Sequence, residues 1–511
     1  MWFRLLYVLL SLNVIFCYKI LALFPHRGKS HYNVFEPMLI ELSKRSHQLT
    51  VINHFPQKIK IDNFEDINLN ENGEDLNEVF PFGFFGSGLL SRLNLVRKLS
   101  VVTEDTCETL NTRVMNEFIR RKEKFDLVLT EHFMGNCYLG LMHFTGGSLI
   151  GLTSGGMVPW SNDYIGNPDN PAYIPILFSG MADSMNFFQR AINTVHYVMT
   201  RLFYKFLIDS PSNELARKYI DSNLPDLDTF AYNTSLILSN IHFTLHRTKP
   251  LVPGLLEIGG VHIGNVRKLP QNIEKWINES SEGVVYFSMG SMLIGHSFPI
   301  KKREMFQRAF SRLKHRVLWK WENDTMPGKP DNVMTQKWMP QFDILCHPNV
   351  KAFVAHGGLL GMTEAVHCGV PVVVMPQFGD QFTNARALEA SGGGVILDFS
   401  TITEDNVYEA LQKVLNPKFK KQAEELSARF KDRPMSPMDT AIYWIEYVAR
   451  HKGAPHLKTA AVGMPFYQYL LLDVIAFLLV VFLSICLVSY YTLKMLLKCV
   501  YPAKVKKTKT N

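Results

Sequence analysis

Several patterns that mark common classes of protein are missing from this sequence of 511 residues. It has no low-complexity tract and no internal repeat, so disorder is not expected. It has no G-x-S-x-G motif, which argues against a serine hydrolase. The composition, with 47% apolar and 20% charged residues, is that of a globular protein. The length predicts two domains with accessory segments rather than a single core.

Cysteine is scarce, and its spacing fits no metal site. Of the seven cysteines, three lie in or beside apolar terminal segments: Cys17, Cys486 and Cys499. The other four are Cys107, Cys137, Cys346 and Cys368. These four contain neither a C-x-x-C pair nor a zinc pattern, so we expect one or two disulfide bonds at most and no bound metal.

Positive charge is concentrated at the C-terminal end. The net charge is +8, and much of it comes from Lys494, Lys498, Lys504, Lys506, Lys507 and Lys509. The remainder is close to neutral, so no nucleic-acid partner is expected. The lysines follow Val474–Leu493, an uncharged segment long enough to cross the roughly 30 Å of a bilayer core. This pattern predicts one transmembrane helix and a cytosolic basic tail over 494–511.

The N-terminus has the features of a secretory signal. Arg4 precedes the uncharged run Leu5–Phe16, which is too short to span a bilayer comfortably. We expect residues 1–18 to be a signal peptide, with an uncleaved anchor as the open alternative. The chain would then be a single-pass type I membrane protein whose bulk faces the lumen.

Two further features concern the compartment. Lys509 and Lys507, third and fifth from the end, resemble the dilysine retrieval signals of endoplasmic reticulum membrane proteins, although a positive flank alone explains them equally well. Sequons at Asn233, Asn278 and Asn323 are compatible with a lumenal chain. We therefore expect an endoplasmic reticulum membrane protein with lumenal domains.

Strands and helices alternate along the first half of the chain. Apolar, β-rich runs predict strands at Ile20–Phe24, Leu49–Asn53, Asp126–Thr130 and Ser148–Leu152. Between the first two, Val34–Lys44 has helical spacing, which makes a βαβ opening. The first half is thus predicted to be an α/β domain over 19–265.

The alternation starts again after a Pro- and Gly-rich linker at 250–270. Strands are predicted at Gly283–Phe287, Val317–Trp319, Val350–Ala355 and Val370–Met375. We predict an α/β fold class with two facing Rossmann-like domains, the second over 266–449, followed by a juxtamembrane segment at 450–473 and the anchor at 474–493. Ligands bind such folds at the carboxyl ends of the strands.

A long apolar helix is predicted between Asn186 and Leu207. Its apolar residues include Phe187, Phe188, Val195, Val198, Met199, Leu202, Phe203 and Phe206. We expect it to pack in the core. A wall for apolar acceptors and a membrane-touching surface are the two alternatives.

The segment Trp338–Gln381 gathers groups suited to a nucleotide sugar. His356 and two glycines follow a predicted strand and open a predicted helix, so backbone N–H groups and the positive helix end can face a diphosphate. Trp338 offers a flat face for a uracil ring, and Gln341 can meet the edge of the base. Glu364 can accept hydrogen bonds from ribose hydroxyls. Asp380 and Gln381 can do the same for the hydroxyls of the sugar.

The spacing within this segment resembles the donor-binding signature of the UDP-glycosyltransferase family. The matching positions are Trp338, Pro340, Gln341, His356, Gly357, Gly358, Glu364, Pro371, Pro376, Asp380 and Gln381. The resemblance extends to Ser288, Gly290 and Ser291, which follow a strand and would also contact the donor. Leu360 departs from it, because many relatives have asparagine there. The resemblance implies a GT-B fold and an insect-type, membrane-bound enzyme that takes a UDP-sugar as co-substrate and holds no cofactor.

The acceptor half should supply a general base. A histidine suits this task near neutral pH, and the resemblance points to His31, which follows the loop after the first strand. His26 on the same loop is the competitor. Glu131, at the carboxyl end of a strand, would orient the imidazole. Asp126 lies about 17 Å away by strand rise and would miss the cleft.

We therefore expect an inverting, metal-independent transfer of a hexosyl group to a hydroxyl of a small lipophilic acceptor, as in detoxification. Lys249 lies where some relatives have an arginine for glucuronate, but the insect-like sequence HGGLLGMTE favours UDP-glucose. A catalytically silent lipophilic-ligand-binding protein on the same fold is the alternative, and an epimerase is disfavoured by the anchor. Assembly into a homo- or hetero-oligomer stays open.

Overall fold

The structure is a computed structural model that describes residues 17–71 and 89–500. The expected signal peptide at 1–18 therefore lies almost wholly outside the described residues, as do positions 501–511 of the expected cytosolic tail. The chain divides into two units. Residues up to Thr459 form the first, and residues from Ala460 onward form the second.

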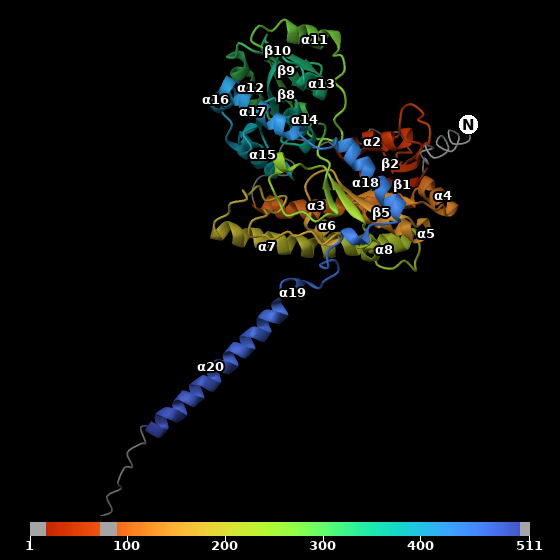
Figure 1. Ribbon diagram of the computed structural model, residues 1–511. Helices are drawn as coiled ribbons and strands as arrows, with labels where there is room; N and C mark the ends of the chain where they lie inside the picture. Colours follow the sequence, from red (N-terminus) through yellow and green to blue (C-terminus); the bar gives the residue numbers. More distant parts are fainter. Residues whose placement is uncertain (1–16, 72–88, 501–511) are drawn as a thin grey trace, which may run out of the picture. The chain divides into compact units, whose positions relative to one another are not determined.

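The first unit opens with a parallel sheet (Figure 1). Among the described residues it has seven strands in the order β3-β2-β1-β4-β5-β6-β7. They are β1 Lys19–Phe24, β2 Gln48–Asn53, β3 Phe64–Asn68, β4 Leu127–Glu131, β5 Ser148–Thr153, β6 Leu236–Ser239 and β7 Leu255–Glu257. The strand order reverses between β1 and β4, and a crevice for ligands opens at such a switch point.

The buried face of α2 (Lys29–Lys44) explains why this sheet forms. Its apolar residues recur every three or four positions, and those buried against the sheet include Val34, Phe35, Met38 and Leu42. The strands themselves are almost continuously buried, as expected for parallel strands covered on both faces. The predicted βαβ opening is confirmed. The helix begins at Lys29 rather than Val34, which places His31 in its first turn.

A second parallel sheet follows in the same unit. Within the described ranges it has six strands in the order β10-β9-β8-β11-β12-β13. They are β8 Val284–Ser288, β9 Arg316–Lys320, β10 Val333–Gln336, β11 Val350–Ala355, β12 Val372–Val374 and β13 Gly394–Ile396. The two Rossmann-like α/β halves that the sequence predicted are confirmed, while β10 and β13 are short strands that it did not predict.

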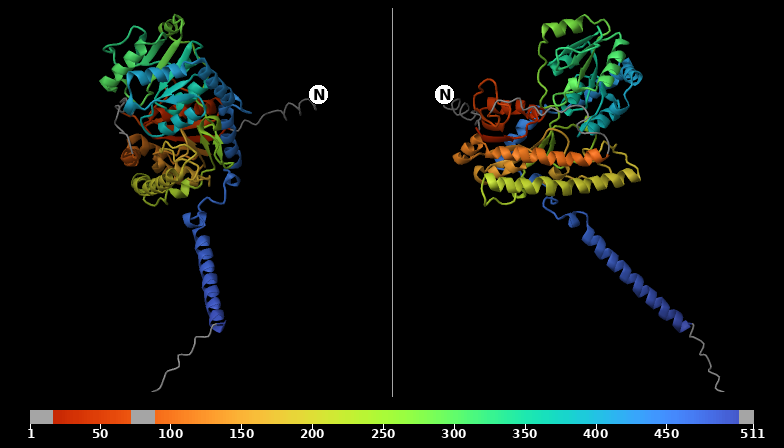
Figure 2. Two further views of the ribbon diagram at one scale, coloured as in Figure 1. Left: turned by 90° about the vertical axis from the view of Figure 1, so that its left-hand side faces the viewer. Right: turned by 180° about the vertical axis from the view of Figure 1, so that it is seen from behind.

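Helices cover both sheets (Figures 1 and 2). Those associated with the first half are α3 Leu89–Glu108, η1 Thr109–Asn111, α4 Arg113–Arg121, η2 Asn136–Leu141, α5 Met142–Thr145, α6 Pro159–Asp163, α7 Phe187–Phe203, η3 Tyr204–Asp209, α8 Ser210–Tyr219, α9 Asp228–Ala231 and α10 Phe243–His246. Those of the second half are α11 Gln271–Asn278, η4 Gly295–Ser297, α12 Ile300–Ser311, α13 Gln341–Leu345, α14 Leu359–His367, α15 Gln381–Ala390, η5 Phe399–Thr401, α16 Glu404–Val414 and α17 Pro417–Lys431.

The chain returns to the first sheet after the second. Helix α18 (Pro437–His451) buries Ala441, Ile442, Ile445 and Val448 in the same core cluster as β1 and α2. The η6 turn, Pro455–Leu457, follows it. The hydrophobic core on this face of the first sheet is therefore completed by a helix more than 400 positions away from β1 in sequence. This packing joins the two halves into one unit.

Two disulfide bonds form in the described part of the chain, Cys107–Cys137 and Cys346–Cys368. The first links α3 to η2, and the second links the end of α13 to the end of α14. This agrees with the expectation of at most two. Cys17, Cys486 and Cys499 are free and exposed.

The predicted helix around Asn186–Leu207 is present as α7 and η3, but the expected core packing is wrong. Its large apolar side chains are exposed to between 37% and 74%: Phe187, Phe188, Ile192, Val195, Val198, Leu202, Phe206 and Leu207. The buried positions are mostly polar, among them Asn193, Tyr197 and Tyr204. The hydrophobic periodicity correctly predicts an apolar face on this helix. That face points away from the protein, and the polar face packs against it.

The second unit contains α19 (Phe466–Tyr469) and α20 (Leu472–Val500). Helix α20 includes the whole predicted span 474–493, and it is long and apolar enough to cross a membrane.

Candidate functional site

One cavity of about 720 Å³ is lined by most of the residues that the sequence singled out for binding or catalysis. It lies in the first unit, where the carboxyl ends of β4 and β5 meet those of β8 and β11. The predicted residues that line it are His31, Glu131, Ser288, Gly290, Ser291, Trp338, Gln341, His356, Gly358, Glu364, Asp380 and Gln381. Residues from the two halves of the chain thus converge on one space.

His31 and Glu131 form a hydrogen-bonded pair on the first-half side of the cavity. His31 Nδ1 lies 2.8 Å from Glu131 Oε1, and the imidazole stacks on the Phe133 ring at 4.7 Å. Burial alone would raise the pKa of Glu131, but the charge and hydrogen bond of His31 bring it below its ordinary value. A buried, ionised carboxylate beside Nδ1 favours the tautomer that carries its hydrogen on Nδ1, in which the Nε2 lone pair can accept a proton.

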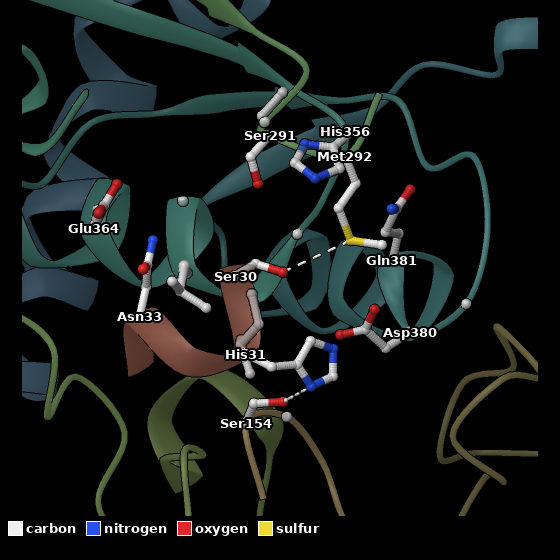
Figure 3. Close-up of a pocket in the computed structure, with 18 of the residues that line it drawn as sticks. Ser30, His31, Asn33, Ser154, Ser291, Met292, His356, Glu364, Asp380 and Gln381 are labelled. Carbon is white, nitrogen blue, oxygen red and sulfur yellow. Dashed lines mark hydrogen bonds between the residues drawn. The ribbon is translucent and has the colours of Figure 1, made fainter. Parts of the chain in front are cut away.

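Ser154, which the sequence reasoning missed, also contacts this pair, and Figure 3 shows its contact with His31. Its Oγ lies 2.8 Å from His31 Nδ1, and its backbone N–H donates to Glu131 Oε1 at 3.1 Å. Ser154 follows β5 directly, so its place at the carboxyl end of a predicted strand was the available signal.

His26 and Asp126 are not equivalent to His31 and Glu131. His26 is buried, its Nδ1 accepts a hydrogen bond from the Gly28 N–H at 2.9 Å, and burial lowers its pKa to about 3. Asp126 accepts from the Lys19 N–H at the opposite end of the strands and does not line the cavity. Of these candidates, His31 is the histidine that carries a carboxylate partner.

Asp380 lies beside the His31 ring from the second half (Figure 3). Its Oδ2 accepts from Asn384 Nδ2 at 2.8 Å. Burial raises its pKa, and Asn384 and His31 partly oppose that effect. The neighbouring Gln381 uses its Oε1 to accept from the Gln377 N–H at 2.9 Å, which fixes the direction of its amide group.

The loop from β11 to α14 has the form of an anion-binding site. Gly357 has a φ of +89°, and Gly358 is the N-cap of α14 with no side-chain cap. The His356 ring packs closely against Gly290 and Gly358. A Cβ atom added to either glycine would lie only 2.5 Å from the ring, so a side chain at either position would clash. Burial, and then the nearby Lys320, lower the pKa of His356 to about 4. A neutral histidine and an uncapped helix end thus face the cavity.

Lys320 is a cation at this site that the sequence reasoning did not identify. It ends β9, lines the cavity, and its Nζ donates to the Gly290 carbonyl at 3.0 Å and to Glu322 Oε1 at 2.8 Å. Its position near His356 supplies positive charge beside the helix end. The only feature of the sequence that could have identified Lys320 is its position directly after a predicted strand.

Gln341 and Glu364 pair with each other at a third part of the cavity. Gln341 Nε2 donates to Glu364 Oε2 at 2.7 Å. Burial raises the pKa of Glu364 to about 7, although the Gln341 hydrogen bond opposes the shift. Trp338, on the same side, is 67% exposed, so its ring remains available for stacking.

The wall opposite these polar groups is apolar. Its side chains come from α3, the residues after β4 and the segments around α6: Leu99, Val102, Phe133, Val158, Leu177 and Phe178. The sequence reasoning named none of them, because no motif governs the loops of an acceptor pocket. Among the described residues, no group of three or more histidine, cysteine or acidic side chains is arranged to hold a metal ion.

Comparison with known proteins decides the family. A model for "UDP-glucoronosyl and UDP-glucosyl transferase" matches residues 13–510. The chain belongs to the UDP-glycosyltransferase family. Relatives include "UDP-glycosyltransferase UGT5" of the insect Dactylopius coccus, 45% identical over 95% of this chain and 94% of the relative, and "UDP-glucosyltransferase 2" of the same species, 40% identical over 94% and 93%. Human "UDP-glucuronosyltransferase 1A6" is 36% identical over 72% of this chain and 69% of its own.

Solved structures agree with this UDP-glycosyltransferase assignment at the level of fold. The calicheamicin glycosyltransferase CalG4 is similar with a TM-score of 0.53 and 17% identity, over 85% of this chain and 99% of its own. The glycotransferase of kitacinnamycin gives 0.55 and 16%, over 84% and 99%. The chain therefore has the GT-B fold, with two facing Rossmann-like domains, and the expected family membership is confirmed.

Proposed function

We propose that this UDP-glycosyltransferase transfers a hexosyl group from UDP-glucose to a hydroxyl of a small lipophilic acceptor, with inversion and without a metal ion. The observation that carries the proposal is the arrangement of the cavity. An apolar wall, the His31–Glu131 pair and the loop that leads to an uncapped helix end all border this one cavity. An acceptor, a sugar and a diphosphate can occupy these three places in that order.

The acceptor hydroxyl is activated by His31. Nδ1–H donates to Glu131, which leaves Nε2 to take the hydroxyl proton as the oxygen attacks the anomeric carbon. Glu131, held ionised by its lowered pKa, stabilises the imidazolium that forms. The bond from the anomeric carbon to the diphosphate oxygen breaks on the opposite face, so the product configuration is inverted.

The departing UDP is stabilised by the second half. Backbone N–H groups at the start of α14, His356 and Lys320 surround the place of the diphosphate, where negative charge grows as the bond breaks. Trp338 would stack on the uracil ring and Glu364 would accept from the ribose. Ser288, Gly290 and Ser291 border the same end of the cavity.

The residues around the sugar position favour glucose over glucuronate. Asp380 and Gln381 offer groups for hydroxyls, and an anionic sugar would meet the Asp380 carboxyl. The lysines and arginines that line the cavity, among the described residues, are Lys98, Arg267 and Lys320. Lys249, the candidate partner for a glucuronate carboxylate, is not among the lining residues.

The donor and the stereochemistry can be tested together. The full-length chain in microsomes is given UDP-glucose or UDP-glucuronate with a panel of phenols and aliphatic alcohols, and UDP release is measured. We expect acceptor-dependent release with UDP-glucose and a β-configured product. An α-configured product would reject direct displacement, and UDP binding without release from either donor would indicate a silent binding protein.

We further propose that the first unit lies in the lumen of the endoplasmic reticulum, anchored by α20 as a single-pass type I protein. Two disulfide bonds suit an oxidising compartment, and Asn233, Asn278 and Asn323 are all exposed. Digestion with endoglycosidase H should increase the gel mobility of the wild-type chain and leave a variant with all three asparagines changed to glutamine unaffected. A wild-type chain that shows no shift would argue against this topology.

A further inference from the structure

Helix α7 and its continuation η3 have their polar side inward. Asn193 Nδ2 donates to the carbonyls of Pro171 and Ile174, at 2.8 Å and 2.9 Å. One turn on, the Tyr197 hydroxyl donates to Asp169 at 2.9 Å. Arg201 pairs with Asp163, and Tyr204 accepts from Asn136. The polar side chains that would face water on an ordinary surface helix therefore form hydrogen bonds and salt bridges with the protein instead.

The outward side is correspondingly apolar. The exposed side chains recur at intervals of three or four residues along most of the helix, which places them on one face. Phe188 is 74% exposed, Val195 59% and Phe206 66%. A helix with this distribution is unsuited to water on its outer face, since a soluble protein seldom exposes a continuous apolar stripe of this length.

The charge along this segment has one sign. No acidic residue occurs between Asp183 and Asp209. Of the basic residues, Arg201 and Lys205 form salt bridges with aspartates of the first unit, and Arg190 is exposed. An apolar face with no acidic side chain on its helix and an exposed arginine near its start suits the interfacial layer of a membrane. A protein partner would have to match a stripe with no anionic group on it.

The chain leaves the first unit next to this helix. Thr459, the last residue of the unit, donates through Oγ1 to the Gly166 carbonyl at 2.9 Å. Gly166 lies three positions after Asp163, the partner of Arg201 on α7. Residues 460–471 then lead to α20 and can span at most roughly 40 Å. Because α20 is the membrane-spanning candidate, this short connection limits how far Thr459, where the chain leaves the first unit, can lie from the bilayer.

Figure 2 shows that α7 runs along the outside of the first unit beside α3, with no other element of that unit covering its outer face. We propose that the exposed face of α7 and η3, formed by Phe187, Phe188, Ile192, Val195, Val198, Leu202, Phe206 and Leu207, lies in the interfacial layer of the membrane that α20 crosses. The partner is the lipid surface itself, which a continuous apolar face without acidic side chains fits.

Spin labelling of the full-length chain tests this proposal. Cys17, Cys486 and Cys499 are changed to serine, and a nitroxide is attached to a single cysteine replacing Phe188, Val195 or Phe206. Ile59 and Ile300, exposed to 80% and 64% elsewhere on the first unit, provide matched control sites. The labelled chains are reconstituted in phosphatidylcholine vesicles, and collision rates with oxygen and with a water-soluble nickel chelate are measured.

We expect labels on α7 to collide mainly with oxygen, with nickel collisions at least fivefold below those at Ile59 and Ile300. Equal nickel collisions at all five sites would overturn the proposal. Protection accompanied by spin–spin broadening, relieved when unlabelled chain is added, would instead assign the face to a second copy and would also overturn it.

A second variant guards against effects of the label. In the chain labelled at residue 206, the triple change Phe188→Asp, Val195→Asp and Leu202→Asp should raise nickel collisions to the level of the control sites. Circular dichroism and thermal unfolding check that the fold is intact, which is expected because these three side chains point outward. Unchanged protection in a folded triple variant would contradict lipid burial of this face.

Discussion

At the scale of single residues, two groups share one atom of the proposed base. His31 Nδ1 lies 2.8 Å from Glu131 and 2.8 Å from Ser154. In the proposed mechanism, Glu131 supplies the charge that stabilises an imidazolium. Ser154 contacts both side chains, since its backbone N–H donates to Glu131, and so it fixes their orientation. We therefore expect Ser154 to position His31, the proposed base, rather than to contact the substrate.

The change Ser154→Ala should lower kcat about fivefold with little effect on KM for the acceptor. The reason is that one hydrogen bond, worth about 1 kcal/mol, no longer holds the imidazole in place. Ser154→Thr keeps the hydroxyl and should recover most of kcat. If the alanine variant raises KM and leaves kcat unchanged, Ser154 lines the acceptor pocket and does not position His31.

Glu364 should make UDP binding depend on pH. Its pKa of about 7 in the free protein means that the carboxyl is mostly protonated at pH 6. A ribose that donates hydrogen bonds to the carboxylate favours the ionised form, so binding releases a proton and strengthens as pH rises. We expect the Kd for UDP to fall several-fold between pH 6 and pH 7.5.

The matched control for this prediction is Glu364→Gln, which has a similar shape and does not titrate. Its Kd should change less over the same range, since only the phosphate of UDP then contributes. Calorimetry at the two pH values measures both proteins. Parallel pH profiles for wild type and variant would show that Glu364 does not contact the nucleotide.

At the scale of helices, each disulfide bond holds one side of the cavity. Cys107–Cys137 fastens α3, whose residues Leu99 and Val102 belong to the apolar wall. Cys346–Cys368 joins the ends of α13 and α14, which carry Gln341 and Glu364. The two bonds should therefore affect different substrates.

Replacing Cys107 and Cys137 together by alanine should raise KM for the acceptor and leave the Kd for UDP close to wild type. The Cys346/Cys368 pair serves as the reciprocal case and should weaken UDP binding instead. Each pair should cost about 2–4 kcal/mol of stability, so kinetics are measured well below the unfolding temperature. Equal effects of both pairs on both substrates would mean that stability alone is involved.

Helices also show how far sequence reasoning reaches. Buried parallel strands such as β1 and β11 are nearly continuous apolar runs, so their pattern predicted them directly. The short strands β10 and β13 have only a few residues, and their pairing depends on neighbours distant in sequence. Helix α7 shows a different limit, because periodicity reveals that a face is apolar but not whether protein, lipid or water covers it.

The same contrast applies to the site. Most of the candidate donor residues stand out in the sequence because they form a dense local pattern between Trp338 and Gln381. Ser154 and Lys320 do not, since each is an ordinary residue type at the end of a strand and becomes meaningful only when the fold brings it to His31 or Gly290. The apolar wall could not be predicted for the same reason, because its side chains come from separate segments of the chain.

At the scale of the whole molecule, the proposed membrane face and the acceptor pocket are physically connected. Asn193 on the inner side of α7 accepts from the Ile176 N–H at 2.9 Å, and Leu177 and Phe178, the next residues, line the cavity. Helix α7 therefore supports the segment that supplies Leu177 and Phe178 to the apolar wall.

The central claim is that His31 is the base of a glycosyl transfer in this cavity. The most direct measurement is acceptor-dependent UDP release from UDP-glucose by His31→Ala, with UDP affinity measured on the same preparation and the exposed His143 changed to alanine as the control. We predict that His31→Ala lowers kcat about 10²–10⁴-fold at an unchanged Kd for UDP, while His143→Ala behaves as wild type. Full turnover by His31→Ala would contradict the account.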